Sequence, residues 1–386
     1  MRNKPRIRFK GFTEDWEQCK LGDLLILLKD GSHGTHKNTS EGVYLLSAKN
    51  IKNGRINIMP DDRIISWDDY NVIHKNYELQ SGDILLTIVG SIGETAIYNL
   101  KTKVTFQRSV AFLRPNLKLK NGFLYTLMNT DRFQNQLQTK QVVSAQPGIY
   151  LGDLASINIT YPKNVSEQEK IYNIFKGIEH SITLHQRKLE KLKLAKKALL
   201  QKLFPKNGSQ FPEIRFKGFT DAWEQYKLED ICLYQSSSVT INDVDENGRY
   251  DLYDVNSLIG KTNKGFMEKE YITIIKDGAG VGRTRILPKN SMFLGTMGAI
   301  TPQNSNLEFL YQLVTSANLG KICSGSTIPH IYFKDYGKLK FYIPSIIEQE
   351  VIGKIFYNID NLITLHQRKL ERLQEVKKGL LQKMFV

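Results

Sequence analysis

Residues 182–204 read ITLHQRKLEKLKLAKKALLQKLF, and residues 363–385 read ITLHQRKLERLQEVKKGLLQKMF, with 17 of 23 positions identical. A second segment also occurs twice: residues 5–21 (PRIRFKGFTEDWEQCKL) and 212–228 (PEIRFKGFTDAWEQYKL) agree at 13 of 17 positions. We call these two copies the leading segments. The interiors between the repeated segments do not match and differ in length. Because such a self-repeat is the signature of a repeated architecture, the chain is predicted to be one scaffold that holds two unlike domains.

The repeated segment 182–204 is predicted to form a long helix. Its apolar residues recur every three or four positions, as at the a and d positions of a coiled coil, with His185 and Lys196 as polar members of the series. The copy at residues 363–385 repeats these steps, and two like units related by a two-fold would run their helices in opposite directions. The leucines expected in the seam between the helices are Leu189, Leu192, Leu199, Leu370, Leu373 and Leu380.

A shorter helix is expected before each long one. Ser166 and Glu169 have the spacing of a capping box, and residues 344–348 have the same capping pattern in the second copy. Gly177 and residues 358–360 are the predicted breaks between short and long helix. The predicted division of the chain is a first domain with its leading segment (1–162), a first helical region (163–207), a second domain (208–344) and a second helical region (345–386).

The interiors contain short β-type runs separated by Gly, Asn and Pro. Residues 83–89 and 94–98 flank one glycine turn, and residues 271–275 and 282–287 flank another. Each pair has the pattern of two strands joined by a turn. We predict that the pairs occupy equivalent places in two divergent copies of one domain. The expected fold class is therefore α+β with an internal pseudo-two-fold repeat and two long antiparallel helices.

The charge of the chain indicates what it binds. A chain of 386 residues with 41% hydrophobic residues can form two or three domains, each with its own core. Its unusual property is a net charge of +15, which attracts polyanions such as nucleic acid. A generally basic surface or a membrane-surface protein would carry the same sign of charge, so the charge alone leaves these alternatives open.

Cysteine usage and hydropathy indicate the compartment. Cys19, Cys232 and Cys323 are scattered and form no CxxC pair, which suits reduced thiols better than a disulfide framework. No apolar run is long enough to cross a membrane. The first residues lack the apolar stretch of a signal peptide. These features predict a cytoplasmic protein.

Several enzyme signatures fail when their spacing is tested. Residues 260–262 (GKT) resemble the end of a phosphate-binding loop, but the Gly required five residues earlier is Val255. The glycine-rich stretch 278–282 precedes a strand-like run and not the helix that a dinucleotide site needs. His33 and His36 have no third metal ligand nearby in the sequence. The chain is therefore predicted to have no catalytic residues, no metal site and no cofactor of its own.

Exposed loops of both interiors supply donors that suit DNA. Arg, Lys, Asn and Gln side chains can match the edges of G and A, and a loop rich in Gly, Ser, His and Thr suits phosphates and base edges. The candidate DNA contacts in the first interior are Ser32, His33, Thr35, Lys37, Lys49, Gln107, Arg108, Gln146 and Tyr150. Those in the second interior are Asn256, Lys261, Lys264, Thr327 and His330.

The repeated segments and their order resemble the specificity subunit of type I restriction–modification systems. The resemblance is carried by two copies of RFKGFTxxWEQxKL, two copies of ITLHQRKLExL…KKxLLQKxF and two divergent interiors. Shorter sequence motifs that are familiar in that family occur at residues 30–34 (DGSHG), 81–85 (SGDIL) and 334–339 (KDYGKL). The resemblance covers essentially the whole chain.

The resemblance implies that each interior is a target recognition domain that reads one half of a bipartite, asymmetric DNA sequence. The two long helices would hold these domains at a set separation. The subunit would have no catalytic activity and would bring two methyltransferase (modification) subunits and the restriction subunits to DNA. S-adenosylmethionine, ATP and Mg²⁺ are expected on those partners and not in this chain.

Two other classes of protein stay open on the residues alone. A basic coiled-coil adaptor that binds RNA or acidic proteins would share the charge and the helices. A self-sufficient nuclease or methyltransferase would share the DNA contacts, but the motifs of both are missing. Preference for one duplex sequence distinguishes the specificity subunit from the adaptor, and methyl transfer by the chain alone would identify the enzyme.

Overall fold

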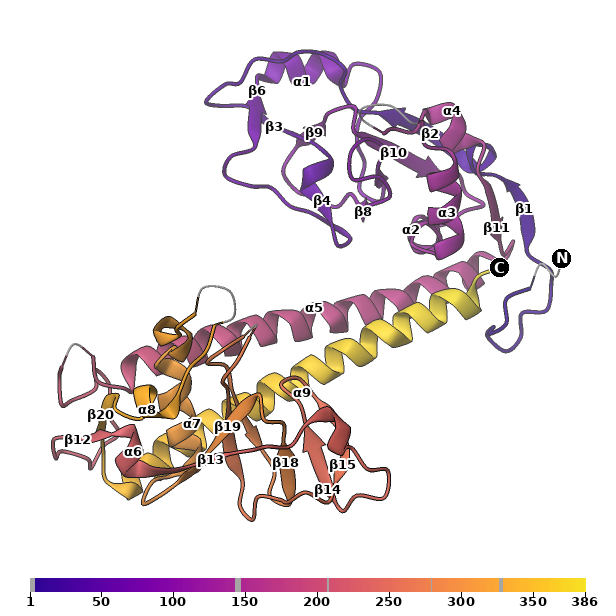
Figure 1. The fold of residues 1–386 in the computed structure, drawn as a ribbon. Coiled ribbons are helices and arrows are strands. Elements are labelled where there is room, and N and C mark those ends of the chain that lie inside the picture. The colour runs from indigo at the N-terminus through magenta and orange to yellow at the C-terminus, as the bar shows by residue number, and fades with distance from the viewer. Residues whose placement is uncertain (1–3, 143–146, 207, 279, 326–328) are drawn as a thin grey trace. The chain divides into compact units, whose positions relative to one another are not determined.

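The computed structural model describes residues 4–142, 147–206, 208–278, 280–325 and 329–386. The chain forms two compact units, which consist of Met1–Leu184 with Leu370–Val386 and of His185–Lys369. Each unit therefore contains one of the divergent interiors and parts of both repeated helices (Figure 1). The four-part division of the chain by residue number stays a prediction.

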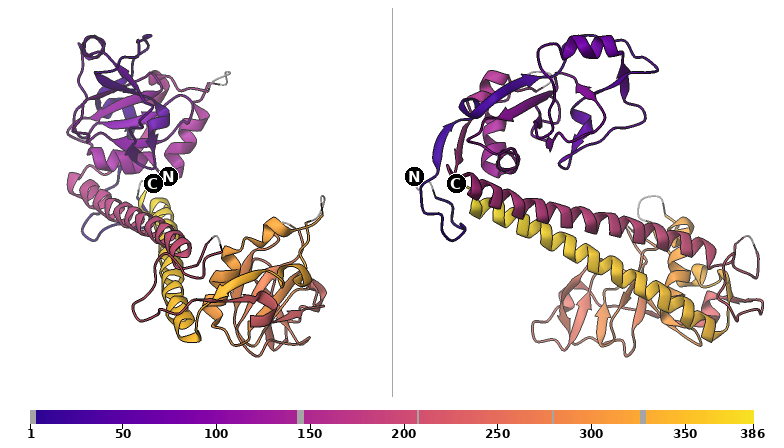
Figure 2. Two further views of the ribbon diagram at one scale, coloured as in Figure 1. Left: turned by 90° about the vertical axis from the view of Figure 1, so that its left-hand side faces the viewer. Right: turned by 180° about the vertical axis from the view of Figure 1, so that it is seen from behind.

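The repeated helical segments form two long helices, α5 (Val165–Lys202) and α9 (Ile346–Met384). The helices lie side by side and run antiparallel (Figures 1 and 2). The sequence of each helix explains its stability, since an apolar stripe at helical spacing buries against the neighbouring helix and the domain. The predicted antiparallel pair of helices is confirmed.

Each long helix is continuous, so the prediction of a separate short helix before it is wrong. Gly177 lies within α5, and residues 358–360 lie within α9. A glycine inside a helix costs only about 1 kcal/mol relative to alanine. The carboxylate of Asp360 accepts hydrogen bonds from Lys196 and Gln312, which hold this part of α9 in place. Packing on both sides of each predicted break therefore outweighs the local sequence signal.

The start of α5 also differs from the prediction. The backbone N–H of Ser166 donates to Oδ1 of Asn164 at 2.9 Å, and the backbone N–H of Glu167 donates to the Asn164 carbonyl. Asn164 thus occupies the capping position, where a short polar side chain satisfies a free backbone donor. The expected capping box between Ser166 and Glu169 is wrong by two residues.

The first unit is built on a four-stranded antiparallel sheet with a smaller sheet beside it. The larger sheet has the order β2 (Leu25–Asp30), β10 (Val110–Pro115), β7 (Ile84–Thr87) and β8 (Thr95–Ile97). The smaller one has the order β6 (Arg63–Ile65), β3 (Val43–Leu46) and β9 (Val104–Phe106). Two short pairs are β1 (Glu17–Lys20) with β11 (Asn158–Tyr161) and β4 (Ile51–Lys52) with β5 (Arg55–Ile56).

Short helices complete the first unit. They are α1 (Trp67–Ile73), α2 (Asn121–Met128), α3 (Asp131–Thr139) and α4 (Leu151–Ala155), with 3₁₀ turns at Leu21–Leu24 and Ala48–Asn50. Ser66 and Thr130 accept backbone hydrogen bonds at the starts of α1 and α3, as N-caps do. The buried core joins the four-stranded sheet to α2, α3 and both long helices.

The second unit has the same plan with different lengths. Its four-stranded sheet has the order β13 (Cys232–Ser236), β19 (Met297–Pro302), β16 (Tyr271–Ile275) and β17 (Thr284–Leu287). Its smaller sheets are β15 (Leu258–Thr262), β14 (Tyr250–Tyr253) and β18 (Ser291–Phe293), and β12 (Glu224–Lys227) with β20 (Lys340–Ile343). Its short helices are α6 (Leu228–Ile231), α7 (Leu307–Ser316) and α8 (Phe333–Tyr336), with 3₁₀ turns at Ile241–Asp243 and Leu319–Ile322.

Both predicted hairpins are present. Strand β7 pairs antiparallel with β8, and β16 pairs antiparallel with β17. β7 and β16 also hold the same place in their four-stranded sheets, next to β10 and β19 respectively. The prediction of two divergent copies of one α+β domain is therefore confirmed.

The leading segments are repeated because each one holds the first turn of a long helix. The guanidinium of Arg8 donates to both carboxylate oxygens of Glu167 at 2.6 and 2.8 Å. Arg215 makes the same two-fold contact with Glu348 at 2.8 Å. Both glutamates are fully buried, so each carboxylate depends on its arginine for a counter-charge.

Each leading segment also packs against the end of a long helix. In the first unit the N–H of Ile7 donates to the carbonyl of Lys383 at 2.9 Å, and the buried Trp16 meets the ring of Phe385. In the second unit Ile214 donates to Lys202 at 2.9 Å, and Trp223 meets Phe204. The Trp of each leading segment therefore packs against the Phe that follows a long helix, and this contact occurs in both units.

The polar residues in the predicted seam pair with polar residues of the other helix. In the second unit Nδ1 of His185 lies 2.7 Å from Nδ1 of His366, and Lys196 donates to Asp360 at 2.7 Å. In the first unit Lys377 donates to Glu179 at 2.7 Å. These contacts explain how polar residues at a/d positions fit between two packed helices.

The six leucines predicted for the seam differ in their surroundings. Leu189 and Leu370 are buried, whereas Leu192 and Leu373 are half-buried. Leu199 and Leu380 pack against the cores of the second and first unit respectively. The leucines near the helix ends therefore contribute to a domain core.

Candidate nucleic-acid interface

A cleft of about 480 Å³ opens at the edge of the four-stranded sheet of the first unit. It lies where the end of β2, the residues after β7 and the start of α4 meet. Its lining combines apolar side chains with charged and aromatic ones, and consists of Asp30, His33, Ile88, Val89, Arg108, Val142, Gly148, Ile149, Tyr150 and Leu151. Three of the predicted DNA contacts, His33, Arg108 and Tyr150, thus lie in one cleft.

The Arg108 side chain extends from a tight turn between β9 and β10. The backbone N–H of Arg108 donates to the carbonyl of Ser32 at 3.0 Å, and Val110 donates to the carbonyl of Gln107 at 3.1 Å. Its guanidinium is exposed and makes no hydrogen bond or ion pair within the residues that the structure describes. A fixed backbone with a free guanidinium suits recognition of a planar acceptor pair such as that of guanine.

Tyr150 is the aromatic member of the cleft. It precedes the first turn of α4 and is 68% exposed. Its neighbour Ile149 is buried and donates its N–H to the carbonyl of Ile88 at 2.9 Å, which fixes the backbone beside the exposed ring. An exposed tyrosine on a fixed backbone offers a flat apolar face and a hydroxyl at low entropic cost.

The loop after β2 carries His33 at the rim of the cleft. Nε2 of His33 lies 2.6 Å from Oδ2 of Asp30. Gly31 allows this loop to approach the neighbouring chain closely, because a Cβ at that position would lie 2.2 Å from the carbonyl oxygen of Phe106. Ser32 and His36 contact each other through Oγ and Nε2 at 2.6 Å, so these two side chains are engaged within the loop.

The remaining candidates of the first unit differ in availability. Thr35 and Lys37 are exposed, and Gln107 is half-buried with its backbone bridged to Ser32. Lys49 forms ion pairs with Asp62 at 2.9 Å and with Asp61 at 3.8 Å. The hydrogen bond to Asp62 raises the pKa of the Lys49 ammonium, and the two carboxylates offset its charge.

Three candidates of the second unit lie on one hairpin. Asn256 is in the turn between β14 and β15, Lys261 is on β15, and Lys264 follows that strand. All three are exposed. Lys264 lies 3.8 Å from Asp243, and Oδ1 of Asn256 accepts a hydrogen bond from Arg283 at 3.4 Å. Lys261 makes no ion pair within the described residues and the contact of Lys264 is long, so both ammonium groups are available to phosphates.

His330 lies elsewhere in the second unit, beside the end of β16. Its Nδ1 lies 2.5 Å from Oδ1 of Asp277, and both side chains are 38% exposed. The ring of the exposed Tyr332 is stacked near that of His330, with the ring centroids 6.4 Å apart. The predicted contacts Gln146 and Thr327 lie outside the described residues.

Asp277 and Asp30 are polar residues of these sites that sequence reasoning missed. Asp277 stands 53 positions before His330, so no local pattern links the two. The available signal was the equivalence of the two strand–turn–strand segments. It places Asp277 two residues after the end of β16, as it places Val89 two residues after the end of β7.

The described residues contain neither a cluster of metal-ligating side chains nor a membrane-spanning helix. No group of three or more His, Cys, Asp or Glu side chains in them is arranged to hold a metal ion. Nor does any helix among them have the length and apolar character needed to cross a membrane.

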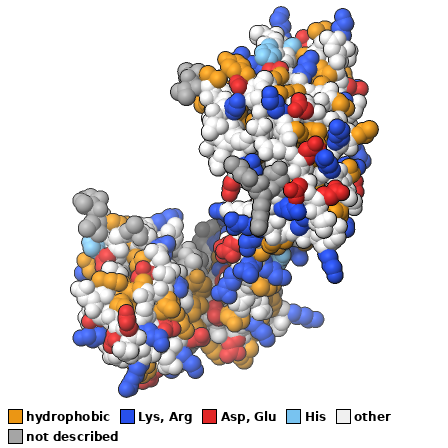
Figure 3. Space-filling model, turned by 90° about the vertical axis from the view of Figure 1, so that its right-hand side faces the viewer, with side chains coloured by type: hydrophobic (Ala, Val, Ile, Leu, Met, Phe, Trp, Pro, Cys, Tyr) orange, Lys and Arg blue, Asp and Glu red, His pale blue; other side chains and the backbone are white. Residues whose placement is uncertain are grey.

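Basic residues are spread over the face of the molecule that Figure 3 draws. On the face drawn in Figure 3, Lys and Arg side chains occur on both units and are mixed with Asp and Glu. This mixture agrees with the ion pairs of Lys49 and Lys264. Local geometry is therefore needed, in addition to net charge, to identify where a nucleic acid would bind.

Comparison with known proteins identifies the family. Residues 13–194 and 220–375 match the family described as type I restriction modification DNA specificity domain. The two matched stretches correspond to the two copies of the repeat. They cover most of the chain.

Two similar proteins come from Methanocaldococcus jannaschii. The putative type I restriction enzyme MjaX specificity subunit is 24% identical over 402 residues, covering 95% of this chain and 92% of that protein. The type I restriction enzyme MjaVIII specificity subunit is 23% identical over 413 residues, covering 95% and 91%. Among solved structures, the S subunit of a type I restriction–modification system from M. genitalium has a TM-score of 0.73 at 19% identity and covers 99% of each chain. This likeness shows that the two chains share a fold.

Proposed function

The chain belongs to the type I restriction–modification DNA specificity family, and we propose that each of its two domains reads one half of a bipartite, asymmetric DNA target. The chain is a specificity subunit, which selects the DNA sequence and leaves the chemistry to other subunits. The adaptor for RNA or acidic proteins does not fit this family.

One observation carries the proposal of two separate half-sites. The two four-stranded sheets have equivalent topology, yet the side chains at their exposed ends differ. Arg108 and Tyr150 lie in the cleft of the first domain, whereas Asp277 and His330 lie at the corresponding place in the second. Equal frameworks with unlike side chains suit a target whose two halves are unlike, in contrast to the palindromes read by homodimers.

The long helices support a role in assembly. Eight large apolar side chains on them are exposed, namely Leu184, Leu194, Ile346, Ile347, Tyr357, Leu362, Leu365 and Val376. Exposed apolar residues on helices that also carry many lysines favour contacts with other proteins. The partners in this proposal are two modification subunits, followed by restriction subunits, with S-adenosylmethionine, ATP and Mg²⁺ bound by those partners. A cytoplasmic location also stays a prediction.

A binding measurement tests the proposal. The chain is co-purified with the modification subunit encoded with it, and the complex is offered a library of duplexes. We expect one bipartite sequence to bind orders of magnitude more tightly than random duplex. Equal affinity for all duplexes, or preference for single-stranded RNA, would contradict the proposal. Methyl transfer by the purified chain alone would contradict its non-catalytic role.

A further inference from the structure

The two domains share one backbone contact at the edge of their four-stranded sheets. In the first domain the N–H of Ile149 donates to the carbonyl of Ile88 at 2.9 Å. In the second the N–H of Ile331 donates to the carbonyl of Lys276, also at 2.9 Å. We call this contact the strand–loop bridge, since it joins the end of β7 or β16 to the loop that precedes α4 or α8.

Neighbouring contacts make the two bridges equivalent residue by residue. Val89 is bridged antiparallel to Gly148, and Asp277 is bridged antiparallel to His330. The next residues correspond as well, because Gly90 donates to Pro147 in one domain and Gly278 donates to Pro329 in the other. Val89 therefore corresponds to Asp277, and Gly148 corresponds to His330.

The strand residue of each bridge makes a further backbone contact, and this contact also corresponds between the domains. Ile88 donates its N–H to the carbonyl of Ser109, and Lys276 donates to the carbonyl of Thr296. The residue before each acceptor is Arg108 in the first domain and Gly295 in the second. The first domain thus has a cation here where the second has no side chain.

Two positions after each bridged loop residue, both domains have an exposed tyrosine. Tyr150 follows Gly148, and Tyr332 follows His330. The tyrosine and the backbone contact are the same in both domains. The bridged pair differs, since it is Val89 with Gly148 in the first domain and Asp277 with His330 in the second. A site that reads different bases in the two domains needs such an arrangement, in which the backbone stays the same and the neighbouring side chains differ.

Stability does not explain the Asp277–His330 pair. The first domain forms the same bridge with Val89 and Gly148, so the backbone contact needs no ion pair. Both side chains are more than a third exposed, and even ion pairs of that exposure contribute little to stability. A role toward a ligand accounts for their position better.

The chemistry of each bridge points to particular bases. The free guanidinium of Arg108 can donate two hydrogen bonds to O6 and N7 of guanine. An ionised carboxylate only accepts, so Nδ1–H of His330 donates to Oδ1 of Asp277 and the second oxygen stays available. A carboxylate oxygen at the protein surface accepts from the 4-amino group of cytosine in the major groove.

We propose that the strand–loop bridge is the base-reading position of both domains. The first domain reads guanine there through Arg108, and the second reads cytosine through Asp277, which His330 positions. The inference rests on the proposed function, since it identifies the reading site of the same DNA-specificity subunit.

An exchange of side chains between the bridges is the first test. Gly148 has room for a side chain, because a Cβ there meets its nearest atoms only at 3.5 Å. The double change Val89→Asp with Gly148→His is expected to alter one base of the half-site read by the first domain. Asp277→Val with His330→Gly is expected to alter one base of the other half-site. The measurement is mapping of the methylated motif in cells that express each variant with its modification subunit.

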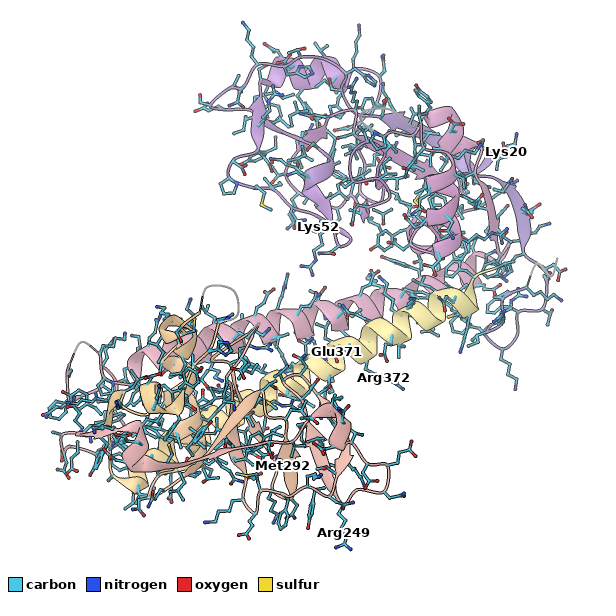
Figure 4. The ribbon with its side chains drawn as sticks, in the orientation of Figure 1. Lys20, Lys52, Arg249, Met292, Glu371 and Arg372 are labelled. Atoms are coloured by element: carbon cyan, nitrogen blue, oxygen red, sulfur yellow. The ribbon has the colours of Figure 1, made fainter. Side chains whose placement is uncertain are left out.

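Single changes with matched controls form the second test. Arg108→Ala and Asp277→Asn are expected to reduce discrimination at one base pair by roughly 5- to 150-fold, the loss expected for one base contact. Lys20→Ala and Arg249→Ala remove exposed cations on β1 and beside β14, outside the bridges, and are expected to leave the motif unchanged (Figure 4). Arg108 is exposed and Asn has the shape of Asp, so these variants test the site even where a double change fails to fold.

The outcomes separate the inference from the proposed function. Loss of any preferred motif in the unaltered complex would overturn both. A specific unaltered complex whose motif is unchanged in Arg108→Ala and Asp277→Asn would overturn the bridge as the reading site and leave the proposed function intact. A base change confined to one half-site supports the inference.

Discussion

The two domains of this protein have the same framework and carry different chemistry at its edge. In the first domain Val89 and Gly148 leave an open cleft of about 480 Å³ beside Arg108. In the second Asp277 and His330 face each other at 2.5 Å in the equivalent place. Because the backbone contact is the same in both, these side chains can change without altering the fold.

The contact between each leading segment and its long helix is the same in both domains. Arg8 with Glu167 and Arg215 with Glu348 make the same buried pair at the start of each long helix. The side chains that differ at the strand–loop bridge lie in loops next to this shared framework, which is where binding residues are commonly found. The comparison predicts that the domains can be altered independently.

The largest expected effect comes from replacing a whole interior. If residues 22–162 are exchanged for the first interior of another member of the family, we expect one half of the recognised motif to change completely and the other half to stay. The preference for the original sequence should fall by orders of magnitude. Motif mapping in cells that carry the chimaera measures this. A change in both halves would show that the domains are not independent.

The next largest effect concerns the shared framework. Arg8→Ala leaves the buried carboxylate of Glu167 without a counter-charge, which costs about 3–5 kcal/mol. Arg215→Ala is expected to cost a similar amount through Glu348. Calorimetric unfolding of both variants measures the cost.

The double changes Arg8→Met with Glu167→Leu, and Arg215→Met with Glu348→Leu, serve as controls. They remove both charges and should restore much of the stability lost by removing one partner. Unequal losses in the two single variants would show that the two frameworks are not energetically equivalent.

The sequence predicted those parts of the fold that depend on repeated or periodic residues. Near-identical segments placed both long helices, and glycine turns placed the hairpins of β7 with β8 and β16 with β17. The continuity of α5 through Gly177 could not be predicted in this way. It depends on tertiary packing, which overrides a local preference of about 1 kcal/mol.

The candidate site was predictable only in part. His33, Arg108 and Tyr150 were found singly, as exposed residue types suited to DNA, and the fold then placed them in one cleft. The pair of Asp277 with His330 joins positions far apart in the chain. Lys49 was a candidate by charge, and its ion pair with Asp62 depends on tertiary structure.

A smaller effect is expected for cations that touch phosphates, and it compares the domains directly. Lys261 in the second domain makes no ion pair within the described residues, whereas Lys49 in the first is paired with Asp62. Lys261→Ala should weaken binding of all duplexes alike and reduce the slope of log affinity against log salt by about 1. Lys49→Ala should leave that slope unchanged. Salt titrations of both variants check this, and equal slopes would mean that ion pairing does not decide which lysines reach DNA.

The smallest effect is expected where the two copies of the repeat meet each other, at His185 and His366. Burial, and after it the charge of His366, lower the pKa of His185, with smaller contributions from Lys369 and Lys188. A histidine whose pKa is lowered in the folded state stabilises that state above the ordinary value near 6.5, and the stability is lost as the pH falls through the folded pKa.

Melting temperatures measured between about pH 5 and 8 should therefore fall on the acid side of the unfolded histidine pKa of roughly 6.5. In His185→Gln, which keeps a polar side chain opposite His366, this fall should be shallower, because the side chain whose pKa is lowered is gone. His180→Gln is the matched control, since His180 is exposed on the same helix. If the control flattens the profile as much as His185→Gln does, the acid sensitivity does not come from the contact between the two repeats.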